Sequence, residues 1–205
     1  MTINLKPGEI IWTGLFLIVF IWSAIEPKDY PTWALETAPA ILGFLVLAIT
    51  RQSFPLTALC YTLILLHCWI LFIGGHYTYA EVPLFDSIRD AFQQSRNNFD
   101  KLGHFVQGFV PAIICREIII RKKIISGKYF THFFTLCFCL ALSALYEMLE
   151  WWVALLSEEA AEAFLGTQGY VWDTQSDMAW ALSGAAIALV TLSNIHNRQI
   201  QQLRS

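Results

Sequence analysis

Apolar residues along this chain gather in six long runs that are separated by polar segments. The runs cover residues 10–25, 33–50, 55–74, 102–120, 129–152 and 173–194. Each approaches the length of about 20 residues that an α-helix needs to cross a bilayer, and none alternates as a half-buried strand does. The pattern therefore predicts an all-α fold, a polytopic membrane helical bundle with about six transmembrane helices.

The composition agrees with a membrane protein and not with a soluble one. Of the 205 residues, 56% are hydrophobic and only 14% are charged, and the mean hydropathy is +0.52. A soluble domain carries about 25% charged residues. One domain accounts for this length, so residues 1–205 are expected to form a single integral membrane domain. The five cysteines lie inside apolar runs without a Cys-x-x-Cys pair, and we interpret them as small hydrophobic side chains.

Lysine and arginine are distributed unequally between the two ends of the predicted bundle. Six spans place both termini on one side, and nine basic residues lie there: Lys6, Arg51, Arg116, Arg121, Lys122, Lys123, Lys128, Arg198 and Arg204. The other side has four: Lys28, Arg89, Arg96 and Lys101. Because basic loops of membrane proteins face the cytoplasm, the N- and C-termini are expected to be cytoplasmic. Nearly all carboxylates lie at the opposite, outer end.

Three polar segments complete the layout. Residues 76–101 form the longest, and within it 86–98 is predicted to be an amphipathic surface helix with Ile88 and Phe92 on its apolar side. A second segment carries Glu158, Glu159 and Glu162, which we interpret as a solvated face. The last, from residue 196 to 205, is predicted to be a polar tail beyond the sixth span.

Candidate chemistry gathers at the outer end. Asp100 and His104 stand four residues apart at the mouth of the fourth run, so a helix places them on one face. An ionisable pair inside a membrane helix is costly to keep, and it indicates a functional site. Acids reach the same depth from the fifth and sixth runs: Glu147, Glu150, Asp173 and Asp177. We predict an outward-facing pocket with walls from three helices.

Two chemical interpretations of this pocket remain open. The first is a divalent metal site, because helical bundles hold metals with His and carboxylates; its candidate ligands are His104, Glu147, Glu150 and Asp177. The second is a site for a lipid-linked or envelope substrate in which Asp100 orients His104 as a general base. The predicted catalytic residues are His104, Asp100, Glu147 and Asp177. The predicted substrate-binding residues are His76, Arg89, Arg96, Glu150 and Asp173.

Other roles compete with these. Asp100 and Asp173, taken singly, are also suited to capping the fourth and sixth helices. For the whole protein the alternatives are a non-enzymatic membrane scaffold and a small-solute or ion transporter. A transporter is disfavoured because the acids lie at the mouth of the bundle and not at its midplane. The lipid bilayer is the expected partner, and no nucleic acid is expected to bind.

Three groups of residues carry a family resemblance. They are Asp100-Lys101-x-x-His104-Phe105, Tyr146-Glu147-x-x-Glu150-Trp151, and Trp172-Asp173-Thr174-Gln175-Ser176-Asp177 followed by Gly184-Ala185. With these motifs the chain resembles the YjdF family of bacterial inner-membrane proteins along nearly its whole length. Its second half also resembles, more loosely, the VanZ-like membrane proteins. The resemblance implies a multi-pass protein of the bacterial cell inner membrane, and it supplies no substrate.

Overall fold

A computed structural model describes residues 6–156 and 168–203, and every regular element in these residues is a helix. Six are long: α1 (Pro7–Ser23), α2 (Tyr30–Thr50), α3 (Ala58–Tyr77), α5 (Phe99–Lys122), α6 (Lys128–Leu156) and α8 (Asp173–Gln202). Two short ones, η1 (Tyr79–Glu81) and α4 (Pro83–Ala91), connect α3 to α5. Among these residues, five helices are long and apolar enough to span a membrane, and α1 is a shorter apolar helix. The predicted all-α bundle with about six spans is confirmed.

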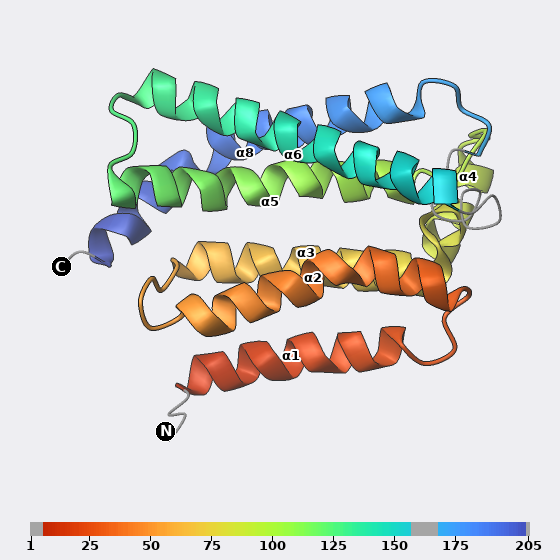
Figure 1. Ribbon diagram of the computed structural model, residues 1–205, viewed down its shortest axis with the longest axis horizontal. Helices are drawn as coiled ribbons and strands as arrows, with labels where there is room; N and C mark the ends of the chain where they lie inside the picture. Colours follow the sequence, from red (N-terminus) through yellow and green to blue (C-terminus); the bar gives the residue numbers. More distant parts are fainter. Residues whose placement is uncertain (1–5, 157–167, 204–205) are drawn as a thin grey trace.

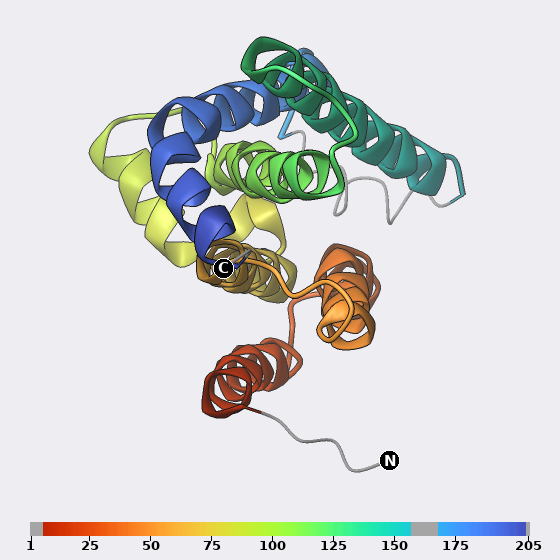
Figure 2. The same ribbon diagram turned by 90° about the vertical axis from the view of Figure 1, so that its left-hand side faces the viewer.

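The long helices lie side by side, with both chain termini at one end of the bundle and α4 at the other (Figure 1). We call these the terminal end and the α4 end. Viewed along the bundle, α5 lies among α3, α6 and α8, whereas α1 lies at the edge (Figure 2). The central position of α5 explains why both buried polar clusters described below contain residues of this helix.

Helix boundaries differ from the apolar runs where local capping sets them. α3 begins at Ala58 because the Thr57 side chain accepts a hydrogen bond from the backbone N–H of Cys60. The amphipathic helix predicted at 86–98 is instead α4, which starts with Pro83 at its first position and ends at Ala91. The predicted polar tail was wrong, because α8 continues to Gln202 and includes His196 as a fully buried residue. The acidic segment 158–162 lies outside the described residues.

Glycines bring α5 and α8 into close contact. A Cβ atom at Gly108 would overlap the carbonyl oxygen of Ala181, and one at Gly184 would overlap that of Phe105. Small residues of this kind let transmembrane helices approach backbone to backbone. Gly108 follows His104 by one turn, so this contact holds the α4-end turns of the two helices close together.

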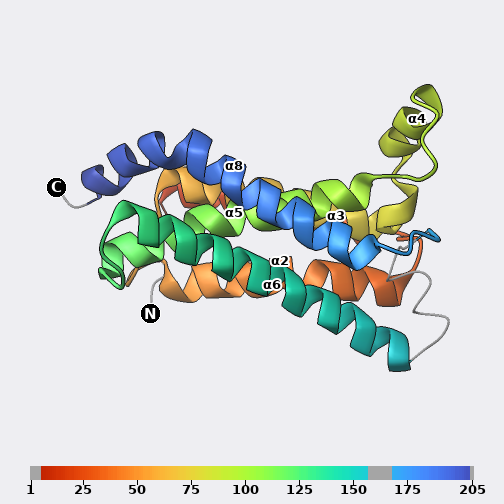
Figure 3. The ribbon, with the colours of Figure 1, turned by 90° about the horizontal axis from the view of Figure 1, so that it is seen from above.

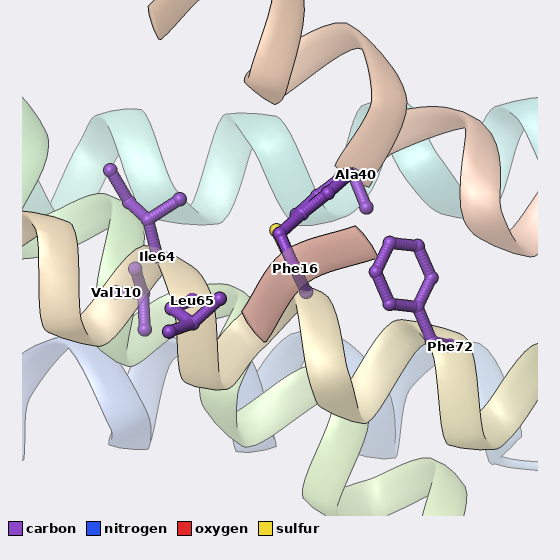
Figure 4. Packing of buried hydrophobic residues seen from close by; sticks show 7 residues of the cluster. Phe16, Ala40, Ile64, Leu65, Phe72 and Val110 are labelled. Atoms are coloured by element: carbon purple, nitrogen blue, oxygen red, sulfur yellow. The ribbon is translucent and has the colours of Figure 1, made fainter. Parts of the chain in front are cut away.

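A separate apolar core joins α1 and α2 to the rest of the bundle. Figure 4 shows side chains of four helices meeting there: Phe16, Ala40, Ile64, Leu65, Phe72 and Val110. Phe16 and Phe72 pack edge to face with ring centroids 5.1 Å apart. Because lipid tails are as apolar as these side chains, the stabilisation comes from close van der Waals packing.

The orientation of the bundle remains a prediction, and fusion reporters test it. A reporter fused after Ser205 is expected to be active in the cytoplasm, and one inserted beside Glu158 in the periplasm, because the basic residues gather at the terminal end. Paired alkaline phosphatase and fluorescent protein fusions measure both sides. The reverse pattern would place the α4 end in the cytoplasm.

Candidate functional site

Seven ionisable residues from four helices meet at the α4 end, and we call them the α4-end cluster. They are Glu36 of α2, Asp100 and His104 of α5, Glu147 and Glu150 of α6, and Asp173 and Asp177 of α8. All are buried except Asp100, whose side chain is 13% exposed. The residues of α5, α6 and α8 lie toward this end of their helices, at the positions for which a common depth was predicted, and Glu36 adds α2.

His104 lies among oxygen atoms on both sides of its ring. Its Nε2 is 3.3 Å from Oδ1 of Asp100, one turn earlier on the same helix. Its Nδ1 is 3.1 Å from Oε1 of Gln107 and 3.8 Å from Oε1 of Glu147 on α6. The i,i+4 pairing predicted for Asp100 and His104 is therefore present.

Two ligand triads share this histidine. Asp100, His104 and Asp177 form one and His104, Glu147 and Glu150 the other, and in each the ligand atoms lie within 4.8 Å of one another. Imidazole and carboxylate groups together suit Zn²⁺, Mn²⁺ and Fe²⁺. The four residues predicted as metal ligands therefore lie together, and Asp100 joins them.

The hydrogen bonding of this cluster is incomplete. Among the described residues, Oε1 of Glu147 and Oδ1 of Asp177 are buried and accept no hydrogen bond. Asp177 is only 2% exposed, and Glu147 is 8% exposed. Buried polar atoms are nearly always paired, so two orphan carboxylate oxygens at one site call for an additional donor or cation.

Arg96 brings a positive charge to the cluster from the segment before α5. Its guanidinium donates to Asp173 and lies 3.5 Å from Oδ2 of Asp100, and the residue is 6% exposed. Asn97 fixes this segment, since its backbone N–H donates to Gln168 at 3.0 Å and its amide donates to the carbonyl of Val82 at 3.0 Å. Arg96 therefore links Asp100 of α5 to Asp173 of α8, and these contacts fix the position of its side chain.

Two predicted substrate-binding residues make their contacts elsewhere. His76 packs its ring on Trp22 and places Nδ1 3.1 Å from the carbonyl oxygen of Ser23. Arg89 pairs with Asp86 at 2.8 Å and with Asp90 at 2.9 Å, along α4 itself. The contacts of these two side chains do not join them to the α4-end cluster.

The capping alternative for Asp100 and Asp173 does not match the helix ends. The N-cap of α5 is Asn98 and that of α8 is Trp172, and neither helix has a side-chain cap. Both aspartates lie within the first turn, where a carboxylate is favourable to the helix dipole. Their side chains contact Arg96 instead.

Glu36 and two tyrosines were missed by reasoning from the sequence. The hydroxyl of Tyr146 donates to Oε2 of Glu36 at 3.0 Å, and Tyr79 is also hydrogen-bonded to Glu36. Burial raises the pKa of the Tyr79 hydroxyl well above its ordinary value, and the charge of Glu36 acts in the same direction, so this group stays protonated. The sequence did contain a signal for Glu36, because a carboxylate inside an apolar run costs free energy to bury and therefore indicates a functional or paired group.

A second buried polar cluster lies at the terminal end. Glu117 accepts hydrogen bonds from the Thr57 hydroxyl at 2.7 Å, from His196 Nε2 at 2.9 Å and from Arg121 at 2.7 Å. Cys60 Sγ is 3.0 Å from Glu117, so this cysteine is not the purely apolar group that was predicted. We call Thr57, Cys60, Arg116, Glu117, Arg121 and His196 the terminal-end network.

In the terminal-end network every carboxylate oxygen is hydrogen-bonded, and Nε of Arg116 is the one buried side-chain atom of the described network that has no partner. Arg116 lies 2.9 Å from Nδ1 of His196, and a guanidinium can only donate. Nδ1 therefore accepts, and the ring proton is on Nε2, facing Glu117. Cys60, Glu117 and His196 also have the mutual spacing of metal ligands. A metal bound to Nε2 of His196 would require the ring proton to be on Nδ1, where this N–H would face the N–H donors of Arg116. The two clusters thus differ in kind, because only the one at the α4 end leaves carboxylate oxygens unpaired.

Comparison with known proteins agrees with the resemblance seen in the motifs. The family model described as predicted membrane protein (DUF2238) matches residues 9–198. The chain is 45% identical over 203 residues to the inner membrane protein YjdF of Escherichia coli (strain K12). The aligned region covers 98% of this chain and 97% of that protein. No solved structure matches the chain. The chain therefore belongs to the DUF2238 family, and it is a multi-pass helical protein embedded in the lipid bilayer of the bacterial inner membrane.

Proposed function

We propose that the α4-end cluster binds a divalent cation and, with it, binds or processes a lipid-linked or envelope substrate at the periplasmic side of the membrane. One observation carries this proposal: the unpaired, buried oxygens of Glu147 and Asp177 converge on His104. A cation between them would satisfy both oxygens at once.

The charge balance of the cluster supports the same conclusion. Within the described residues, six carboxylates face one guanidinium and one imidazole: Glu36, Asp100, Glu147, Glu150, Asp173 and Asp177 against Arg96 and His104. Buried carboxylates without compensation are costly, because the low-dielectric interior does not solvate them. A divalent cation would compensate these carboxylates, and ionisable residues inside a membrane mark functional sites.

The chain's own groups divide between holding the cation and handling the substrate. His104, Glu147, Glu150 and Asp177 are the proposed ligands, and Asp100 orients His104 from the preceding turn. A bound cation would polarise an oxygen of the substrate's polar group. Arg96, held on Asp173 and Asp100, would place its charge beside that group.

Metal analysis of the purified protein tests this function. We expect the detergent-solubilised wild type to retain about one equivalent of Zn²⁺, Mn²⁺ or Fe²⁺, the ions suited to this mixed donor set. His104→Ala, Glu147→Gln and Asp177→Asn are each expected to lose it and to fail to reverse the phenotype of a deletion strain. Inductively coupled plasma mass spectrometry measures the metal.

Asp90→Asn is the matched control for this experiment, because Asp90 is 71% exposed on α4 and outside the cluster. It should bind metal and complement as the wild type does. If the three cluster variants insert normally and complement fully, the cluster has no part in the function and the protein is better described as a scaffold.

A further inference from the structure

A second feature of the α4 end is an apolar groove beside the cluster. Its volume is about 320 Å³, and it is lined by Trp22, Ile73, Tyr77, Val82, Pro83, Leu84, Phe85 and Phe99. These residues come from the last turns of α1 and α3, from α4 and the residue before it, and from the first turn of α5. The lining offers aromatic rings and aliphatic groups with few hydrogen-bonding atoms, so it suits a hydrocarbon and not a polar head group.

The setting of α4 determines what can reach this groove. α4 projects sideways from the end of the bundle (Figure 3), as an amphipathic helix lying in a membrane interface does. Leu84 is 66% exposed and Phe92 is 74% exposed, whereas Arg89 pairs with Asp86 and Asp90 on the polar side. The apolar side of α4 and the groove are therefore expected to face lipid chains and not water.

The groove and the cluster adjoin at the start of α5. Phe99 lines the groove and packs on Tyr79 and Phe85, with centroids 5.5 and 5.2 Å away, and the next residue along the chain is Asp100 of the cluster. Asn97 ties the two sites together, because its amide donates to the carbonyl of Val82 in the groove. The neighbouring residue, Arg96, donates to Asp173. A molecule with a chain in the groove would thus have its polar end beside the cluster.

We infer that this groove holds the hydrocarbon chain of the lipid-linked substrate whose polar group the α4-end cluster binds. The inference rests on the proposed function and adds the substrate class, an amphiphile with one long chain and a polar group at its end. The aromatic rings of Phe85 and Phe99 form the floor against which the chain packs, and Leu84 forms the outer lip.

Photo-crosslinking tests the inference with a defined probe. The protein is reconstituted in nanodiscs of phosphatidylethanolamine and phosphatidylglycerol that contain a small fraction of polyprenyl phosphate carrying a diazirine on its chain. After irradiation, mass spectrometry locates the label. We expect the peptides containing residues 73–99 to be labelled well above the lipid-facing surface of α8, although the host phospholipids compete in large excess. A phosphatidylethanolamine probe with a diazirine on its acyl chain forms the second arm and should show no such preference.

Two groove variants and two controls complete the design. Ile73→Trp fills the groove, and Leu84→Glu places a charge on its exposed lip without disturbing packed residues; each should reduce groove labelling about tenfold, the loss expected when about two methylenes are no longer buried. Val190→Trp, at a position 82% exposed, and Ser87→Glu, on the exposed side of α4, should leave it unchanged.

Either of two outcomes would overturn the inference. Equal labelling by both probes would make the groove an ordinary lipid contact, and unchanged labelling in Leu84→Glu would place the chain elsewhere. Metal content is measured on the same samples. Leu84→Glu should retain the metal, so a failure of the groove inference is distinguishable from a failure of the proposed metal site.

Discussion

Replacing Glu117 by alanine is expected to lower the free energy of unfolding by about 3–5 kcal/mol, the usual cost of removing one partner from a buried charged network. Glu117 is fully buried and accepts hydrogen bonds from Thr57 at the N-cap of α3, from Arg121 of its own helix α5 and from His196 of α8. Its loss leaves the Thr57 hydroxyl and the ring N–H of His196 without their acceptor, and it leaves the guanidinium of Arg121 with only the carbonyl of Pro55. The same change removes the hydrogen bonds that connect the start of α3 and the end of α8 to α5.

Thermal unfolding in detergent, followed by the fluorescence of the tryptophans, measures this effect. Glu117→Gln should be milder, since the amide oxygen still accepts some of these bonds. Glu9→Gln is the matched control, because Glu9 pairs with Arg51 at 3.0 Å with its side chain 34% exposed, and surface pairs contribute about 0–1 kcal/mol. If Glu117→Ala unfolds at the same temperature as the wild type, the terminal-end network does not stabilise the bundle.

The number and order of the long helices could be predicted from the sequence because the bilayer imposes a length on each apolar run. The ends of the helices could not. The sixth run ends near residue 194 by hydropathy, yet α8 continues to Gln202 because His196 is satisfied by Glu117 and Arg116. Hydropathy counts such a histidine as polar, and only its partners on another helix explain why it is buried.

Only part of the candidate site could be predicted from the sequence. Asp100 with His104, and Glu147 with Glu150, follow from helical spacing within one segment. Glu36 does not, because its contact with Tyr146 joins residues 110 positions apart. The same holds for Cys60 with Glu117, which are 57 positions apart. Spacing along one helix is local information, whereas the choice of facing helix is set by packing such as the close approach at Gly108.

Removing a carboxylate from the α4-end cluster is expected to have the opposite effect on stability from removing Glu117. In metal-free protein, Glu147→Gln and Asp177→Asn should raise the free energy of unfolding by about 1–2 kcal/mol, because each removes a buried carboxyl group that has an unpaired oxygen. The gain should come with a complete loss of function. Binding sites commonly carry charge that the empty protein would be more stable without.

Melting curves with and without metal separate the two contributions. At a metal concentration of about 100 times the dissociation constant, the wild type should gain about 2.7 kcal/mol, whereas both variants should gain nothing. The curves are measured in chelator and again with added Mn²⁺ or Zn²⁺, with Asp90→Asn as the control that keeps the wild-type response. If Glu147→Gln and Asp177→Asn destabilise the chelated protein as Glu117→Ala does, the carboxylates of the α4 end serve the fold. If instead they stabilise it and abolish the response to metal, the charge at the α4 end is retained for binding a cation.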